Sequence, residues 1–122
     1  MALRCLIIDD NAGFVAVARD LLEREGFAVV GDAANGFEAL RQARELRPDV
    51  TLLDIDLGGE SGFDVVRELV EDAGGAPSKV ILISTHAEAD YAELIEASPA
   101  AGFVAKTDLS SDSILAVLRG AA

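Results

Sequence analysis

The chain has 122 residues and a mass of 12.7 kDa, which fits a single domain over residues 1–122 and excludes two large ones. Hydrophobic residues make up 51% of the sequence, so the chain can build a packed core and wholesale disorder is excluded. The 22 acidic residues outnumber the 10 basic ones and give a formal net charge of −12. A chain this acidic should repel the phosphate backbone of DNA or RNA.

The sequence also bears on the compartment in which the chain works. Its single cysteine, Cys5, permits no disulfide within the chain, so we expect a reducing, cytoplasmic location and a buried position for Cys5. Apolar runs are only a few residues long, and the N-terminus lacks a basic stretch followed by a long apolar one. We therefore expect neither a signal peptide nor a membrane span.

Short apolar runs alternate with helical patterns along the chain. In chain order, the runs that predict strands are Leu3–Ile8, Phe27–Ala34, Val50–Leu53, Val80–Ser84 and Phe103–Ala105. Apolar residues at helical spacing predict a helix after each strand, the fourth of them over Ala89–Ala97, and residues 73–78 are expected to form a loop. The helix boundaries are indicated by breaking or capping residues: Gly26, Pro48, Ser61, Pro99 and the pair Ser110/Ser111.

Five strands alternating with five helices predict a doubly wound α/β domain of the flavodoxin-like type. Its parallel sheet should have the order 2-1-3-4-5, with right-handed crossovers and helices on both faces. In such a sheet the winding direction reverses between the first and third strands, and ligands bind at the carboxyl ends of the strands there. We therefore expect the functional site at that edge of the sheet.

Polar side chains gather where the predicted strands end: Asp9 and Asp10 after the first, Asp54 after the third, Ser84 at the end of the fourth and Lys106 after the fifth. Three carboxylates in one crevice repel each other unless a cation compensates, and hard oxygen ligands favour Mg²⁺ or Mn²⁺. A phosphoryl group transferred to a carboxylate needs its oxygens neutralised by a cation, an ammonium and a hydroxyl. We therefore predict that Asp54 is a phosphoacceptor.

Four segments support this interpretation by their order and spacing: Cys5-Leu-Ile-Ile-Asp-Asp10, Val50-Thr-Leu-Leu-Asp54-Ile-Asp56-Leu, Ile81-Leu-Ile-Ser84 and Gly102-Phe-Val-Ala-Lys106. They resemble the acid-pair, phosphoacceptor, hydroxyl and lysine segments of the receiver domain of two-component response regulators. The resemblance covers essentially the whole chain. It implies a phosphorylation-dependent signalling switch rather than an enzyme with steady turnover.

The resemblance also implies a role for each acidic residue of these segments. Asp54 would be phosphorylated by a histidine kinase, a phosphotransfer protein or a small phosphodonor. Asp9 and Asp10 would organise the metal ion, with Asp10 and Asp54 as direct ligands. The backbone carbonyl of Asp56 would complete the protein's share of the ligands.

The remaining motif residues would sense the phosphoryl group. By the same resemblance, Ser84 would bond a phosphoryl oxygen, Lys106 would pair with the group, and Phe103 would occupy the aromatic switch position. The face formed by the fourth helix, the fifth strand and the fifth helix would report the change and serve as a surface for homodimerisation. Whether the chain acts alone or with a C-terminal output domain stays open, as do its kinase and stimulus.

Four departures from the family pattern affect these expectations. Thr107 stands where proline commonly follows the lysine, so we expect a trans Lys106–Thr107 bond. The segment 57–60 lacks the frequent proline and is expected to be more flexible. Thr85 replaces a smaller residue and would narrow phosphodonor access, and Phe103 replaces the frequent tyrosine, so its switching must proceed by packing.

Two residues near the expected site suggest how the lifetime of the phosphate is tuned. Asp56 and His86 each follow a motif residue by two positions, and we hypothesise that they place or exclude the attacking water. Two other functions stay open at this stage. Asp54-Ile-Asp56 also resembles the nucleophile motif of haloacid-dehalogenase-type phosphatases, and a receiver-like scaffold could bind partners without being phosphorylated.

Overall fold

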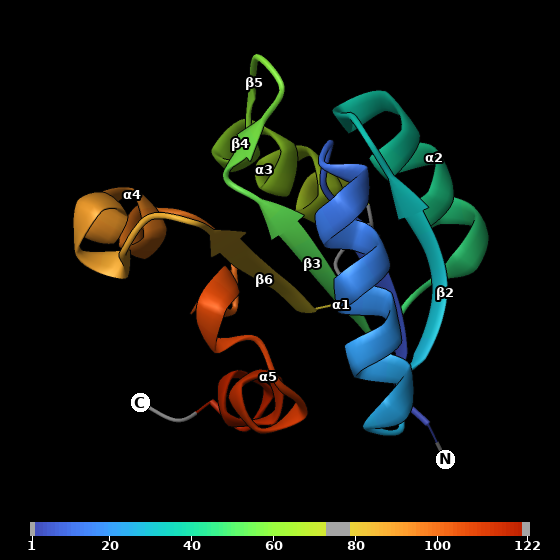
Figure 1. Cartoon of the computed structure of the whole chain (residues 1–122). Helices are drawn as coiled ribbons and strands as arrows, with labels where there is room; N and C mark the ends of the chain where they lie inside the picture. Colours follow the sequence, from blue (N-terminus) through green and yellow to red (C-terminus); the bar gives the residue numbers. More distant parts are fainter. Residues whose placement is uncertain (1, 73–78, 121–122) are drawn as a thin grey trace.

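The computed structural model describes residues 2–72 and 79–120, and a five-stranded parallel sheet lies at its centre (Figure 1). Its order, β2-β1-β3-β6-β7, confirms the predicted order 2-1-3-4-5 and the flavodoxin-like fold. The strands are β1 (Arg4–Ile8), β2 (Ala28–Ala33), β3 (Val50–Asp54), β6 (Lys79–Ser84) and β7 (Gly102–Ala105). Each predicted strand end lies within one residue of the observed end.

Helices cover both faces of this sheet (Figure 1). Helices α1 and α5 pack on one face, whereas α2 and α3 pack on the other. The helices are α1 (Ala12–Arg24), α2 (Gly36–Leu46), α3 (Gly62–Asp72), α4 (Ala92–Ala97) and α5 (Ser111–Leu118), and the 3₁₀ turns are η1 (Glu88–Tyr91) and η2 (Lys106–Asp108). The predicted loop at 73–78 lies outside the described residues.

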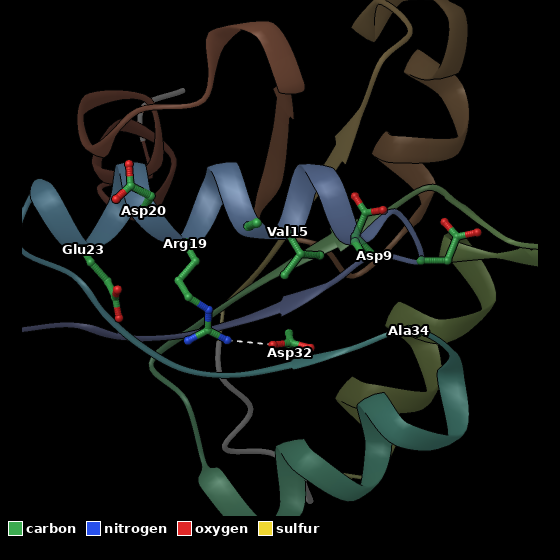
Figure 2. A pocket seen from close by; sticks show the side chains of 10 residues that line it. Asp9, Val15, Arg19, Asp20, Glu23, Asp32 and Ala34 are labelled. Atoms are coloured by element: carbon green, nitrogen blue, oxygen red, sulfur yellow. Dashed lines mark hydrogen bonds and ion pairs between the residues drawn. The ribbon is translucent and has the colours of Figure 1, made fainter.

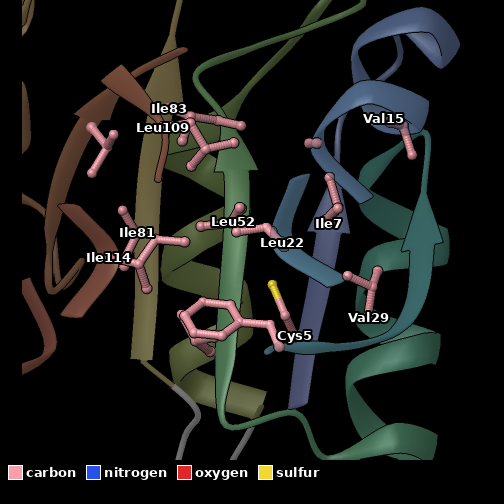
Figure 3. Close-up of a cluster of buried hydrophobic side chains, with 14 residues drawn as sticks. Cys5, Ile7, Val15, Leu22, Val29, Leu52, Ile81, Ile83, Leu109 and Ile114 are labelled. Atoms are coloured by element: carbon pink, nitrogen blue, oxygen red, sulfur yellow. The ribbon is translucent and has the colours of Figure 1, made fainter. Parts of the chain in front are cut away.

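The core divides into two clusters because successive side chains of a strand point to opposite faces. Cys5 and Ile7 of β1 contribute to the cluster under α1 and α5, which Figure 3 shows. Leu6 and Ile8 contribute to the cluster under α2 and α3. Cys5 is fully buried, as predicted. The acidic residues lie at the ends of β1 and β3, and these two strands are held in place because both of their faces are buried.

Local capping fixes where helices begin after these strands. The side chain of Asn11 accepts a hydrogen bond from the Phe14 amide at the start of α1, directly after the acid pair. Ser110 and Ser113 form a capping box at α5, which confirms the predicted Ser110 cap. Each cap lies within a few residues of a strand end, so the β1–α1 and β7–α5 connections at this edge of the sheet are short.

Two segments differ from the sequence-based expectation. The helix expected over Ala89–Ala97 begins as the 3₁₀ turn η1, and α-helical geometry starts only at Ala92. The segment 57–60, expected to be a flexible loop, lies in a two-stranded hairpin of β4 (Asp56–Leu57) and β5 (Glu60–Ser61). The structure thus shortens the expected α-helix and shows a short antiparallel strand pair where a loop was expected.

Two other expectations concern peptide geometry and membrane insertion. Across the described ranges there is no cis peptide bond, so the Lys106–Thr107 bond is trans, as predicted, and it opens the turn η2. Among the helices in residues 2–72 and 79–120, none is long and apolar enough to cross a lipid bilayer.

Candidate functional site

The carboxyl ends of the strands bring the predicted acidic residues together. Asp9 follows β1, and Asp54 is the last residue of the adjacent strand β3. One carboxylate oxygen from each of Asp9, Asp10 and Asp54 lies within 4.8 Å of the others. Asp9 and Asp54 are buried, whereas Asp10 is exposed. The three residues therefore form an acidic cluster with one side open to solvent.

Lys106 supplies the positive charge nearest to this cluster. Its Nζ lies 2.7 Å from Asp9 Oδ2 and 3.3 Å from Asp54 Oδ2, so it forms ion pairs with carboxylates from two strand ends. The same nitrogen lies 4.3 Å from the ring centroid of Phe14 on α1, a cation–π distance. Burial lowers the pKa of Lys106, but the two carboxylates outweigh burial and the net shift is upward. Lys106 is therefore held in place and stays charged.

The Asp54 carboxyl lies in an environment that opposes its ionisation. Burial and the charge of Asp9 raise the pKa of Asp54 to about 6, although Lys106 acts in the opposite direction. The Asp56 amide donates a 3.1 Å hydrogen bond to Asp54 Oδ1, which also favours the charged form. At neutral pH the carboxylate is ionised but poorly compensated, so an additional cation would be favourable here.

The donor set of this cluster fits a hard divalent cation. Asp9 Oδ1 accepts a 2.8 Å hydrogen bond from the Asn11 amide. In contrast, Asp9 Oδ2 is buried and accepts no hydrogen bond within the part of the chain that the structure describes, and only the ion pair with Lys106 compensates it. Three carboxylates without histidine or cysteine are typical of sites for Mg²⁺ or Mn²⁺. The residues present therefore fit the predicted ion.

A cavity of about 210 Å³ opens beside the acidic cluster and contains most of the predicted site residues. Its walls come from the ends of β1, β3 and β6, from the β4–β5 hairpin and from Lys106: Asp10, Asn11, Asp54, Asp56, Gly58, Ser84, Thr85, His86 and Lys106. Ser84 is buried and its Oγ accepts a 3.0 Å hydrogen bond from the His86 amide, whereas Thr85 and His86 are exposed. A carboxylate, a hydroxyl and an ammonium thus border one small space.

Phe103 lies outside this cavity. It is half-buried on β7 and packs against the cluster under α2 and α3, to which Tyr91 also belongs. The Tyr91 ring lies 6.0 Å from the His86 ring in an edge-on arrangement and 6.1 Å from the Phe63 ring. Tyr91 therefore connects His86, which lines the cavity, with Phe63 in the core cluster against which Phe103 also packs.

A larger groove of about 510 Å³ lies between α1 and the end of β2, and both Asp9 and Asp10 line it. Figure 2 shows Asp9 toward one end of this groove. Within it, Arg19 of α1 forms a 2.7 Å ion pair with Asp32 of β2 (Figure 2). Ser84 and Lys106 do not line this groove. The groups suited to a phosphoryl oxygen therefore belong to the smaller cavity.

Sequence reasoning missed three residues of the site. Asn11 lines the cavity, Phe14 lies beside the Lys106 ammonium, and the Gly58 backbone lies against the Asp10 carboxylate. Asn11 and Phe14 could have been found, because the loop and first turn after the acid pair must lie at the same edge of the sheet. Gly58 could be assigned only once the hairpin was known.

Comparisons with known proteins agree with this geometry. Among curated proteins, the chain is 35% identical over 113 residues to a putative transcriptional regulator of Pseudomonas aeruginosa, covering 93% of this chain and 54% of that protein. It is also 35% identical over 97 residues to the chemotaxis protein CheY of Thermotoga maritima, covering 80% of this chain and 78% of CheY. The chain thus spans about half the length of the Pseudomonas regulator.

A solved structure shows the same likeness. The crystal structure of a response regulator protein from Burkholderia pseudomallei, with a phosphorylated aspartic acid, a calcium ion and citrate, matches with a TM-score of 0.79 and 30% identity. The match covers 95% of this chain and 66% of that one. The family model of the response regulator receiver domain matches residues 5–119, and neither the phosphatase nor the unphosphorylated scaffold is favoured. The chain belongs to the receiver domain family of two-component response regulators.

Proposed function

We propose that Asp54 is the phosphoacceptor of this receiver domain. The observation that supports this most is the convergence of Asp54, Ser84 and Lys106 on one cavity beside the acidic cluster. A nucleophilic carboxylate, a hydroxyl donor and an ammonium are the groups that phosphoryl transfer to aspartate requires. We propose that the domain accepts phosphate stoichiometrically and has no turnover on other substrates.

In the transfer step, an ionised Asp54 oxygen attacks the phosphorus atom of the donor. A new O–P bond forms while the bond between phosphorus and the donor's imidazole nitrogen, or its acyl oxygen, breaks and the electron pair leaves with the donor. Lys106 balances charge on the phosphoryl oxygens, and the Ser84 hydroxyl donates to one of them. Since the pKa of Asp54 is about 6, the nucleophile is ionised at neutral pH.

Mg²⁺ or Mn²⁺ is the proposed cofactor of this step. Asp10 and Asp54 would ligate the ion directly, with the backbone carbonyl of Asp56 as a further ligand and Asp9 as an organising carboxylate. When bound, the ion would neutralise negative charge on the transferring group. The acidic cluster supports this assignment, because among the described residues the buried Oδ2 of Asp9 is compensated only by its ion pair with Lys106.

Phosphorylation would then change the contacts of Ser84 and Lys106. Ser84 Oγ, which now accepts from the His86 amide, would turn to the new phosphoryl oxygens, and Lys106 would exchange a carboxylate partner for them. We propose that Phe103 responds by repacking beside Tyr91, because it has no hydroxyl to bond. The α4–β7–α5 face would report this shift in population.

Three residues around the cavity are proposed to tune its chemistry. Asp56 and His86 line the cavity next to Asp54 and Ser84, where they can place or exclude the water that hydrolyses the phospho-aspartate. Thr85 lines the same space and would narrow the approach of a phosphodonor. Their positions on the cavity wall support these roles.

The cellular setting is also a proposal. We propose a cytoplasmic receiver over residues 1–122 that is phosphorylated by a histidine kinase or phosphotransfer protein and acts on a C-terminal output domain or a separate partner. We further propose that two copies pair through the α4–β7–α5 face. The net charge of −12 argues against direct binding of nucleic acid by this chain.

Intact-mass measurement tests the phosphoacceptor assignment. The wild-type chain, incubated with Mg²⁺ and acetyl phosphate, should gain the mass of one phosphoryl group, and chelation of the metal should prevent the gain. Asp54→Asn should gain nothing, whereas Asp49→Asn, at an aspartate before β3, should react like wild type. Labelling of Asp54→Asn to the wild-type level would overturn the assignment.

A further inference from the structure

We propose that Glu60 is a positioning residue that holds the β4–β5 hairpin against the metal-binding acids. The inference rests on the proposed function, because it concerns how this chain's own residues prepare the metal site. Glu60 lies outside the cavity and six positions beyond Asp54. Its role follows from two contacts of the hairpin, one with the Asp10 carboxylate and one with the first residue of α2.

The inner side of the hairpin forms one wall of the site. Asp56, whose carbonyl is a proposed ligand, begins β4, and its amide donates to Asp54 Oδ1 over 3.1 Å. At the turn, a Cβ on Gly58 would lie 2.7 Å from Asp10 Oδ2, so the glycine backbone packs directly against the Asp10 carboxylate. A displaced hairpin would therefore disturb both Asp10 and the Asp56 carbonyl.

The turn of this hairpin has two consecutive residues at positive φ, a geometry that glycine adopts without steric cost. Gly58 and Gly59 have φ angles of +52° and +95°, as expected for the central pair of a type I′ turn. Proline, with φ near −65°, could not occupy position 58 in this turn. Two adjacent glycines also leave the turn with much conformational entropy to lose on folding. The hairpin therefore needs anchors from other parts of the chain.

The outer strand of the hairpin is anchored on α2 by Glu60. Its Oε1 accepts a 2.9 Å hydrogen bond from the Gly36 amide, the first residue of α2. A Cβ on Gly36 would lie 2.7 Å from Glu60 Oε2, so glycine at this position makes room for the carboxylate. The amide of a first helical residue has no partner within its helix, and an acidic group is favourable there.

Two other contacts hold the hairpin: Leu57, which pairs with Glu60 beside the turn, packs in the core, and a backbone hydrogen bond closes the base. Leu57 is 1% exposed and packs in the cluster under α2 and α3. The Gly62 amide donates to the Ile55 carbonyl over 2.7 Å and closes the base. The bond from Gly36 to Glu60 is thus a long-range hydrogen bond at the pair of residues that flanks the turn, and the turn bears on Asp10. Its loss should loosen the turn without unfolding the domain.

Mg²⁺ affinity of the unphosphorylated chain, measured by calorimetry, tests this role without relying on activity. Glu60→Ala should weaken binding about three- to tenfold, since it removes one charge-assisted hydrogen bond that fixes the wall. Glu60→Gln keeps an oxygen acceptor and should restore most of the affinity. Glu68→Ala, which removes an exposed acid of α3, controls for the loss of charge. At saturating Mg²⁺ the labelling rate of Glu60→Ala should approach that of wild type.

A second pair of variants tests the contact at the turn itself. Gly58→Ala and Gly59→Ala both place a side chain at positive φ, but only the Cβ at position 58 would meet Asp10. Within residues 2–72 and 79–120, no atom beyond the chain neighbours of Gly59 would lie within 4 Å of a Cβ there. Gly58→Ala should therefore lower the affinity for Mg²⁺ more than Gly59→Ala does, even where the two variants lose the same thermal stability.

The outcomes separate this inference from the function on which it rests. If wild type binds no Mg²⁺ and accepts no phosphate, the proposed function fails. If wild type binds Mg²⁺ and Glu60→Ala binds it equally well, the positioning role is wrong. If Glu60→Gln loses as much affinity as Glu60→Ala, the effect comes from charge alone and the positioning role is again wrong.

Discussion

The position of Asp54 is unfavourable for its charged form when no cation is bound. Burial, together with the charge of Asp9, raises the pKa of Asp54 from 3.8 to about 6 on folding. A carboxyl with a raised native pKa binds its proton more tightly in the folded state. Ionisation of Asp54 therefore lowers the free energy of unfolding most above pH 6. This destabilising effect shrinks as the pH falls toward 3.8.

Asp54→Asn should consequently stabilise the metal-free chain. At pH 7 in the presence of a chelator, we expect a gain of about 1–3 kcal/mol in the free energy of unfolding, because the amide carries no charge to desolvate. The gain should shrink at lower pH, as the wild-type carboxyl takes up its proton. Urea unfolding of both chains at several pH values measures it. A constant difference across pH would contradict the assigned cause.

Lys106 should stabilise the folded chain, because its positive charge compensates the carboxylates of Asp9 and Asp54. Lys106→Met keeps the apolar stem but leaves Asp9 and Asp54 without their ammonium partner, and it should cost about 1–3 kcal/mol in the metal-free chain. Mg²⁺ should recover part of this loss, because it supplies positive charge to the same carboxylates. Lys79→Met is the matched control, since Lys79 is the other of the two lysines and is exposed.

Thermal unfolding with and without Mg²⁺ measures both lysine variants. Lys79→Met should differ little from wild type under either condition. If Lys106→Met is as stable as wild type without metal, the ion pairs at 2.7 and 3.3 Å contribute little to stability.

At the scale of elements, the buried strands were predictable and the segments between strand ends and helices were not. β1, β3 and β6 are apolar on both faces, so their sequence pattern differs from that of any helix in the chain. The order of the strands could be predicted from the winding rules. That order also predicted that Asp9, Asp54 and Lys106 meet at the carboxyl edge of the sheet.

The hairpin and the turn η1 depend on tertiary contacts that leave a weak local signal. A two-residue strand such as Asp56–Leu57 is too short for periodicity to show, and Gly58-Gly59 alone suggests flexibility as readily as a type I′ turn. The anchor at Gly36 lies 24 residues from Glu60, beyond any local pattern. The sequence-based expectation for segment 57–60 therefore left out the contact between Glu60 and Gly36.

Asp56 and His86 both line the cavity, and they should act on phosphate loss in opposite directions. Asp56→Ala should lengthen the half-life of the phosphorylated chain, because its carboxylate can accept a hydrogen bond from the attacking water. His86→Ala should shorten it, because removal of the ring opens the cavity to solvent. We expect changes of roughly two- to tenfold, equivalent to about 0.4–1.4 kcal/mol in the barrier.

Loss of the phosphoryl group, followed by intact mass after removal of the phosphodonor, measures these half-lives. Glu88→Ala, at an exposed acid that does not line the cavity, should leave the half-life unchanged. Equal half-lives for wild type, Asp56→Ala and His86→Ala would refute the tuning role of both residues.

At the scale of the whole molecule, the negative charge is unevenly placed with respect to the proposed dimer face. The segment η1–α4 exposes Leu94, an apolar side chain that is 54% exposed, among acidic residues. The exposed acids of this segment are Glu88, Asp90, Glu93 and Glu96. In a two-fold symmetric dimer through this face, these acids of one copy would approach those of the other and repel them.

Dimerisation of the phosphorylated chain should therefore strengthen with ionic strength and depend on Leu94. Raising the salt from about 50 mM to about 500 mM shortens the Debye length to a few ångströms and screens the repulsion between exposed acids, whereas burial of apolar surface is retained.

Leu94→Glu should weaken the dimer roughly tenfold or more, because it replaces an apolar contact with a further like charge. Phe37→Glu on α2, at a side chain that is 78% exposed but outside the face, should leave it unchanged. Analytical ultracentrifugation of the three chains with acetyl phosphate and Mg²⁺ measures the association, and equal weakening by both substitutions would place the dimer contact elsewhere.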